Sequence, residues 1–375
     1  MKKESLYKSI QSDIQEKILD GTYPSGHQLM PENQMADHYS VSRITIRNAM
    51  DNLVNARLVE RIRGKGTFVV DKKDRTDIHL GTDLQLKEKK ISLIVPNLND
   101  LHTIKIFNGL YGEAEKKGFA VTVYQTRQDQ KLEEQAISRS LRSEASGLCI
   151  YPIQKEMYNE EIIKLALSRF PAVLIDRSLE GINVNSVVTD NETASYDATR
   201  YLLSKGHRNI GFISPNLDLA IPLRERYRGF VRAHEEAGVE MINGKFDPYG
   251  DVISRMGMES TIEEYDNTEF ERFIKESKEI SAFLCAEPLD TKLLMKTLKK
   301  MRKAVPDDIS LVGFDDFDNA ELFSPPPTVV RQDSEGMGRI ALSILARLIS
   351  GEEEERKSIR IDADLIVRES VRDIS

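Results

Sequence analysis

The sequence predicts an α/β protein in two parts: a small helical N-terminal domain that ends in a hairpin, and a larger body of two doubly wound parallel-sheet lobes. Three observations predict this division. The chain has 375 residues, more than one compact domain usually holds. Apolar residues recur at helical spacing within residues 1–70. From residue 90 onward, short apolar strands alternate with amphipathic helices.

The composition excludes several classes of protein. No run approaches the roughly 18 apolar residues of a membrane span, and the charged N-terminus lacks the apolar core of a signal peptide. Cys149 and Cys285 are too far apart for a CxxC pair, and each lies in an apolar run. We therefore expect a cytoplasmic protein that has no membrane contact, no metal site and no cofactor.

The formal net charge of −8 hides an asymmetry along the chain. Residues 1–75 hold 13 Lys and Arg against 10 Asp and Glu, a net charge of +3, so the remainder carries −11. A local basic excess is typical of a nucleic-acid-binding segment. A solvated charged surface gives such an excess too, so the motifs have to decide.

Three helices are predicted in the first 55 residues. The first ends at Gly21 and is carried by apolar residues at helical spacing, namely Tyr7, Ile10, Ile14 and Ile18. Pro31, in a first-turn position, opens a short second helix, and residues 40–42 separate it from the third. Two helices joined by a tight turn therefore precede residue 55.

The third helix has a polar side that suits DNA. Its apolar stripe consists of Ile46, Ala49, Met50 and Leu53, which leaves Ile44, Thr45 and Arg47 pointing away from the core. An exposed isoleucine beside Thr and Arg fits a helix in the major groove, where it can contact a thymine methyl group. The alternative is a single exposed apolar residue, which is common on protein surfaces.

Two short strands follow, at 58–63 and 67–70, around a turn that contains glycine. With the three helices they form a winged helix–turn–helix. The turn offers Arg63, Lys65 and the backbone of Gly64 and Gly66, groups suited to phosphates or to a minor groove. Gly-Lys-Gly alone also fits a plain hairpin.

The run Val41 to Leu53, followed by the Arg-Gly-Lys-Gly-Thr-Phe-Val of residues 63–69, resembles the GntR family of bacterial transcription factors over about residues 5–70. Met30-Pro31-Glu32 stands where the family usually has Pro-Ser-Glu. The resemblance implies binding to double-stranded operator DNA. With the exposed isoleucine, the implied contacts are Asn33, Ser42, Arg43, Ile44, Thr45, Arg47, Arg63, Gly64 and Lys65. Ser42 as a mere helix cap and Arg47 as a surface ion-pair partner are the structural alternatives.

The remainder divides into a linker and a body. Residues 71–89 are mostly polar and predict a linker, so the expected domains are 1–70, 71–89 and 90–375. The first lobe is expected to hold strands near 91–95, 120–124, 148–151 and 173–176. The second is expected to hold strands near 187–189, 210–214, 282–286 and 309–314.

Ligands of open α/β sheets bind beyond the carboxyl ends of the strands. The residues after the predicted strands are therefore site candidates: 97–101 with Asp100, Tyr151, Asp176, Arg177, Ser214 onward, Glu287, Asp315 and Asp316. The chain has no Trp, so Tyr151, Phe107 and Phe317 are the aromatic residues considered for stacking on a sugar.

From about residue 90 to the C-terminus, the body resembles the effector-binding core of LacI/GalR repressors, a periplasmic-binding-protein-like fold. The similar segments include 206–213 (GHRNIGFI), 224–230 (RERYRGF) and 306–316 (PDDISLVGFDD). The resemblance implies that Arg226 and Asp315 bind sugar hydroxyls and that Asp176 occupies another cleft position. Glu287-Pro288 replaces the common Asn-Asp, which implies altered hydrogen bonds to the ligand. An interlobe ion pair for Arg226 and a strand-end turn for Asp315-Asp316 stay open.

A GntR head on a LacI/GalR-like body is the arrangement of the arabinose-operon repressor type. It predicts a homodimeric transcriptional regulator, a repressor released from its operator by a small carbohydrate such as L-arabinose. A purine or other non-sugar effector is an alternative, as is a regulator fused to an enzymatic domain. The sequence contains no Ser-His-Asp elbow, P-loop or HExxH motif, so we expect no enzyme. A transport solute-binding protein would need an export signal.

Overall fold

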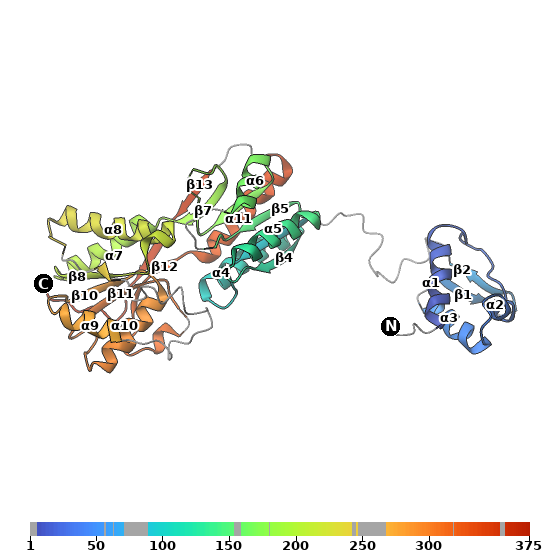
Figure 1. Ribbon diagram of the computed structural model, residues 1–375, viewed down its shortest axis with the longest axis horizontal. Helices are drawn as coiled ribbons and strands as arrows, with labels where there is room; N and C mark the ends of the chain where they lie inside the picture. The colour runs from blue at the N-terminus through green and yellow to red at the C-terminus, as the bar shows by residue number, and fades with distance from the viewer. Residues whose placement is uncertain are drawn as a thin grey trace. The chain divides into compact units, whose positions relative to one another are not determined.

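The structure, a computed structural model, describes residues 6–55, 58–62, 64–70, 89–153, 159–179, 181–241, 245–246, 268–317, 319–352 and 357–375. The chain forms two compact units, Met1–Lys87 and Glu88–Ser375 (Figure 1). Residues 71–88 of the predicted linker lie outside the described residues, and a strand begins at Lys89. Within the described ranges, no helix is long and apolar enough to cross a membrane.

The first unit is the predicted winged helix–turn–helix. Its elements are α1 (Leu6–Leu19), α2 (Glu32–His38), α3 (Arg43–Asn55), β1 (Val59–Ile62) and β2 (Gly66–Val69). The strands pair antiparallel, with Val59 opposite Val69. Ile14, Ile46 and Leu53 are at most 1% exposed in the shared core, as their spacing predicts. Pro31 is the residue before α2, not part of its first turn, because its ψ of 143° is extended.

The second unit contains two six-stranded sheets. The first lobe has the order β13-β7-β6-β5-β3-β4 and the second has β14-β12-β11-β10-β8-β9. All neighbours pair in parallel except β12 and β14. The strands of the first lobe are β3 (Lys89–Val95), β4 (Phe119–Gln125), β5 (Gly147–Ile150), β6 (Ala172–Ile175), β7 (Asn185–Thr189) and β13 (Ser358–Ile361). Those of the second are β8 (Ile210–Ile213), β9 (Lys245–Phe246), β10 (Ala282–Cys285), β11 (Ser310–Phe314), β12 (Thr328–Gln332) and β14 (Ala363–Ile366).

Helices cover both faces of each sheet (Figure 1). The first lobe has α4 (Leu101–Lys117) and α11 (Ser334–Ser350) on one face, and α5 (Gln130–Arg142) and α6 (Glu160–Ser168) on the other. The second lobe has α7 (Asn191–Ser204) and α8 (Ile221–Ala237) opposite α9 (Thr268–Glu276) and α10 (Pro288–Lys300). Short 3-10 turns lie at Leu217–Leu219 and Ala320–Leu322. This is the predicted doubly wound, periplasmic-binding-protein-like architecture.

Strand β7 belongs to the first lobe and not to the second. The prediction that residues 187–189 open the second lobe is wrong, because β7 pairs with β6 and β13 in the first. All five residues of β7 are buried, and a strand buried on both faces carries no periodic signal of the sheet to which it belongs. The chain passes between the lobes at three crossovers, residues 189–191, 332–334 and 361–363.

Candidate DNA-binding face and effector site

The recognition helix α3 presents polar side chains on the side away from the core. Arg43 and Arg47 are exposed, and Ile44 is 73% exposed, which confirms the orientation predicted from helical spacing. Ser42 Oγ accepts a hydrogen bond from Thr45 N at 3.2 Å and lies 2.8 Å from Thr45 Oγ1. Ser42 therefore caps α3, and the paired hydroxyls lie at the exposed start of the helix.

The wing is fastened to the segment before α2. Gly64 and Lys65 form its exposed turn, whereas Arg63 lies outside the described residues. Gln28 Nε2 donates to Lys65 O at 2.7 Å, and Gln28 also forms a β-bridge with Phe68. Sequence analysis missed this support, since a single bridging residue has no strand periodicity.

Arg61 joins the wing to both helices of the helix–turn–helix. Its guanidinium lies 2.8 Å from Glu32 on α2 and 2.5 Å from Asp51 on α3. By contrast, Arg43 and Arg47 form no ion pair within the described residues. The surface ion-pair alternative for Arg47 is therefore not found there. Asn33 is exposed on α2.

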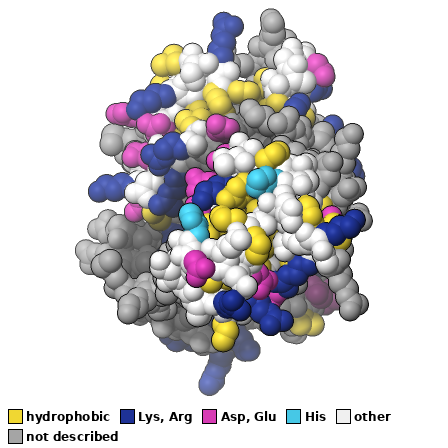
Figure 2. Space-filling view, turned by 90° about the vertical axis from the view of Figure 1, so that its right-hand side faces the viewer, with side chains coloured by type: hydrophobic (Ala, Val, Ile, Leu, Met, Phe, Trp, Pro, Cys, Tyr) yellow, Lys and Arg dark blue, Asp and Glu magenta, His cyan; other side chains and the backbone are white. Residues whose placement is uncertain are grey.

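Basic side chains do not gather into one patch on the face shown in Figure 2. Lys and Arg side chains are spread among Asp and Glu there (Figure 2). This distribution agrees with the overall charge of −8.

The predicted effector residues come from both lobes. In the first lobe, Asp100 caps α4 after β3, while Tyr151 and Asp176 directly follow β5 and β6. In the second, Arg226 is buried on α8, Glu287 lies two residues after β10 at the start of α10, and Asp315 directly follows β11. Asp176 and Asp315 have φ values of 66° and 65°. The backbone therefore adopts the left-handed conformation at both residues, directly after β6 and β11.

Electrostatic coupling across the lobes places these groups in one cluster. Burial raises the pKa of Glu287, the positive charges of Arg226 and Arg177 oppose that rise, and Asp315 and Asp176 add to it. Arg177 and Asp176 belong to the first lobe, whereas Arg226, Asp315 and Glu287 belong to the second. Charged groups of both lobes therefore act on Glu287.

His102 is a central member of this cluster that sequence analysis missed. Its Nε2 lies 2.8 Å from Asp176 Oδ1, and its Nδ1 lies 2.8 Å from Ser334 Oγ. Burial lowers the pKa of His102, but the Asp176 carboxylate, with Asp315 and Asp100, raises it to about 9. The imidazole is therefore protonated at neutral pH and can donate from both nitrogens. The available signal was its position immediately after the candidate range 97–101.

Asp176 is held in its ionised form. Burial raises the pKa of this carboxyl, but His102 and Arg177 lower it by more than burial raises it. The net pKa of Asp176 therefore lies well below the usual range. The Arg177 guanidinium carbon lies 4.9 Å from the centre of the Tyr151 ring, and its Nη1 donates to Pro152 O at 2.9 Å. Tyr151 is thereby occupied on one side of its ring by a first-lobe arginine.

Arg226 is oriented by neutral groups. Its Nε donates to Asn191 Oδ1 at 2.8 Å, its Nη1 donates to Ala286 O at 2.6 Å, and its Cζ lies 3.6 Å from the centre of the Phe314 ring. Among the described residues, Arg226 forms no ion pair, so the interlobe ion-pair alternative is not found. No ion pair among the described residues compensates the positive charge of the guanidinium, so it can interact with another group in the cluster.

The two aspartates after β11 differ in their partners. Asp315 Oδ1 accepts from Gln332 Nε2 at 2.6 Å. Asp316 accepts two hydrogen bonds from Arg368, at 3.1 and 2.8 Å, so this predicted candidate serves to hold the C-terminal segment. Phe317 is buried, and Lys292 lies over its ring.

Comparison with known families follows the division into two units. Residues 6–69 match the gntR family of bacterial regulatory proteins, and residues 199–371 match the periplasmic binding protein-like domain. The chain joins a GntR-family head to a periplasmic-binding-protein-like body. Two relatives that cover nearly the whole chain are named transcriptional repressors.

Similar proteins cover nearly the full length of this GntR-type regulator. The arabinose metabolism transcriptional repressor of Halalkalibacterium halodurans is 26% identical over 376 residues, 98% of this chain and 96% of that protein. The repressor of the same name from Geobacillus stearothermophilus is 26% identical over 385 residues, 100% of both. The crystal structure of a LacI family transcriptional regulator from Silicibacter pomeroyi is 26% identical, with a TM-score of 0.63 over 75% of this chain and 98% of that one.

Proposed function

We propose that this GntR-family regulator is a repressor that leaves its operator when a small carbohydrate such as L-arabinose binds between the lobes of its body. The observation that carries the proposal is the cluster of Asp176, from the first lobe, with Arg226, Glu287 and Asp315, from the second. Carboxylates accept hydrogen bonds from sugar hydroxyls, and a guanidinium donates to their oxygens. Two full-length relatives bear the name arabinose metabolism transcriptional repressor.

The proposed switch is closure of the lobes around the sugar. A ligand that contacts both lobes binds the closed arrangement better than the open one. It shifts the equilibrium only by that difference in affinity. Coupling free energies between two sites are typically about 1–3 kcal/mol, which corresponds to about 5-fold to 150-fold in operator affinity.

The proposed DNA contacts lie on α3 and the wing. Arg43 and Arg47 are exposed beside Ile44, and neither is engaged in an ion pair within the described part of the head. An arginine can read guanine bidentately or neutralise a phosphate. The further proposed contacts are Asn33, Ser42, Thr45, Arg63, Gly64 and Lys65.

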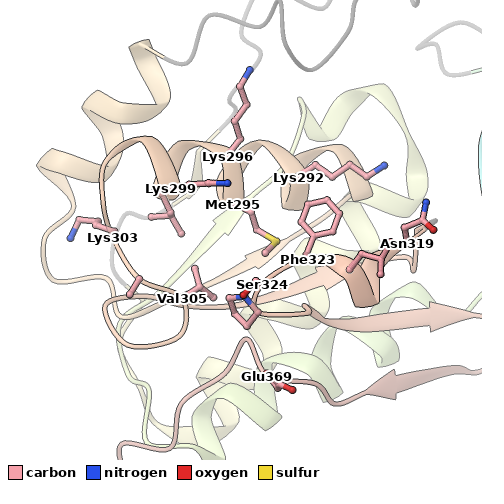
Figure 3. Close-up of a pocket in the computed structure, with 14 residues that line it drawn as sticks. Lys292, Met295, Lys296, Lys299, Lys303, Val305, Asn319, Phe323, Ser324 and Glu369 are labelled. Atoms are coloured by element: carbon pink, nitrogen blue, oxygen red, sulfur yellow. The ribbon is translucent and has the colours of Figure 1, made fainter.

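We propose that two copies bind a pseudo-palindromic operator as a homodimer. A single winged head buries too little DNA for tight specificity, so a two-fold pair of half-sites is expected. In the second lobe, Leu322 is 75% exposed and lines a hollow of about 1010 Å³ with Met295 and Phe323, and Lys292, Lys296 and Lys299 of α10 also line it (Figure 3). This hollow is lined by several lysines and does not form an extended apolar patch. Sedimentation of the full chain as a monomer at working concentration would contradict the dimer.

Thermal melting against a ligand panel tests the effector class. The panel contains L-arabinose, other pentoses, hexoses, sugar phosphates and nucleobases. A ligand that binds only the folded body stabilises it by about 2.7 kcal/mol at 100 times its Kd. We expect L-arabinose or a related sugar to raise the melting temperature of the wild type and of Arg142→Ala, a surface control on α5, but not of Arg226→Ala. A rise caused by nucleobases alone would replace the sugar with the non-sugar alternative.

A further inference from the structure

The three crossovers between the lobes are hydrogen-bonded to one another. Asp190 N donates to Ile361 O at 2.8 Å, which joins the first crossover to the third. Thr189 Oγ1 donates to Gln332 Oε1, which joins the first to the second. Because the chain passes between the lobes at these three places, any rotation of one lobe against the other is absorbed here.

One side chain of the first crossover also orients the effector residue Arg226. Asn191 is 1% exposed, and its Oδ1 accepts from Arg226 Nε at 2.8 Å. Its Nδ2 donates to Thr189 O at 3.1 Å and faces Glu225 Oε2 at 3.5 Å. The amide therefore connects Arg226 to the crossover backbone and to the carboxylate that precedes Arg226 in the sequence.

Glu225 is held by a cation from the other lobe. This carboxylate on α8 of the second lobe is 5% exposed, and its Oε1 accepts from Arg360 Nη2 at 2.7 Å. Arg360 lies on β13 of the first lobe, just before the third crossover, and its Nη1 is 3.7 Å from Asp190 Oδ1. Arg228, a further cation near Glu225, is 3.7 Å away and belongs to the same helix. Separating Arg360 from Glu225 would leave this buried carboxylate without its shortest ion pair among the described residues, which is costly for a buried charge.

We propose that Arg360 is a positioning residue for the effector response: its interlobe ion pair with Glu225 fixes Asn191 and, through it, the orientation of Arg226. Rotation about the crossovers moves β13 relative to α8, so it changes this ion pair and the setting of Arg226 together. The role of Arg226 in binding the effector rests on the proposed function. The effect of Arg360 on lobe motion does not rest on it, because that effect can be measured without sugar or DNA.

Distances between the lobes provide the first test. Spin labels are attached to the full chain at Glu115→Cys on α4 and Glu235→Cys on α8, both exposed positions, while the native Cys149 and Cys285 are buried. We expect Arg360→Gln to broaden or shift the interlobe distance distribution measured by pulsed electron resonance.

The matched control is Arg331→Gln, which removes an exposed arginine whose partner, Asp364 at 3.7 Å, lies in the same lobe. This control should leave the distribution as in the wild type. An unchanged distribution in Arg360→Gln overturns the proposal, whatever the effector proves to be.

Operator release by L-arabinose provides the second test. We expect Arg360→Gln to bind operator DNA normally without sugar, but to reduce the factor by which L-arabinose weakens that binding by about 2-fold to 30-fold, the range found for residues that modulate coupling. Arg360→Lys should restore part of the response, because an ammonium can still meet the Glu225 carboxylate as a point charge.

The outcomes separate the two claims. A full arabinose response in Arg360→Gln overturns the coupling role. If the wild type responds neither to L-arabinose nor to any other sugar of the panel, the proposed function fails at that point. The distance measurement then decides whether Arg360 controls the lobes.

Discussion

The charged side chains between the lobes shift the pKa values of two carboxyl groups in opposite directions. His102 and Arg177 keep Asp176 ionised within the first lobe. In the second lobe, burial and the nearby Asp315 and Asp176 hold the pKa of Glu287 above its usual range, against Arg226 and Arg177. Glu287 therefore takes up a proton more readily than a solvated glutamate and, once protonated, can donate a hydrogen bond as well as accept one. An asparagine at position 287 would not titrate, because its amide group donates and accepts hydrogen bonds without a change of charge.

His102 makes the stability of the body depend on pH. Its pKa of about 9 in the folded chain exceeds the ordinary value of 6.5. Its contribution is therefore complete below about pH 6.5 and is lost as the pH rises through about 9. The difference corresponds to at most about 3 kcal/mol. We expect the melting temperature of the wild type to fall more steeply between pH 6.5 and 9.5 than that of His102→Gln. Parallel curves would show that folding does not raise the pKa of His102.

Arg47 is the side chain on which the DNA contact can be tested with least disturbance to folding, because it is exposed. Arg47→Ala should lose about 1–3 kcal/mol of operator affinity if the arginine reads a guanine, or reduce the salt slope by about one if it meets a phosphate. Fluorescence titration at several salt concentrations measures both, with Arg142→Ala as the control. Unchanged affinity and slope would leave Arg47 as an ordinary surface residue.

The sequence could predict the polar side of α3 and the residues that follow buried strands, because these depend on local periodicity and on a general rule for parallel sheets. It could not predict His102, Asn191 or Gln332. His102 contacts Ser334, which lies 232 residues away in the sequence. Asn191 contacts Arg226 at a separation of 35 residues, and Gln332 contacts Asp315 at a separation of 17. Such contacts are created by the crossovers, and no pattern within one segment records them.

Helix packing in the first lobe depends on two close backbone approaches. A Cβ atom on Gly109 of α4 would lie 1.9 Å from Glu335 O of α11, and one on Gly338 of α11 would lie 2.0 Å from Ile106 O. The two helices therefore touch backbone to backbone. Since α11 follows the second crossover, their separation also determines where that crossover enters the lobe.

Gly109→Ala should force these helices apart and destabilise the body by about 1–3 kcal/mol, the usual cost of overpacking. Gly112→Ala is the matched control on the same helix, since its Cβ would meet nothing within 4 Å. There the better helix propensity of alanine should stabilise by up to about 1 kcal/mol. Urea unfolding of both variants measures the difference. Equal midpoints would mean that the α4–α11 contact is looser than described.

The assignment of β7 shows where reasoning from single elements ends. Its existence follows from an apolar run, but its lobe depends on the β13 strand, whose first residue lies 173 positions after that of β7. The positions of the three crossovers could not be predicted from the sequence for the same reason, because they depend on pairing between strands that are far apart in the chain. They connect the effector cluster to both sheets, so they are essential to the proposed switch.

At the scale of the whole molecule, we propose that a DNA-binding head acts together with a body whose lobes close around a sugar. Fluorescence anisotropy of the full chain with a duplex selected from a random pool, with and without L-arabinose, tests this union most directly. We expect tight binding without sugar and an operator affinity about 5-fold to 150-fold weaker at saturating L-arabinose. Tight binding that L-arabinose and every other sugar leave unchanged would contradict the central claim.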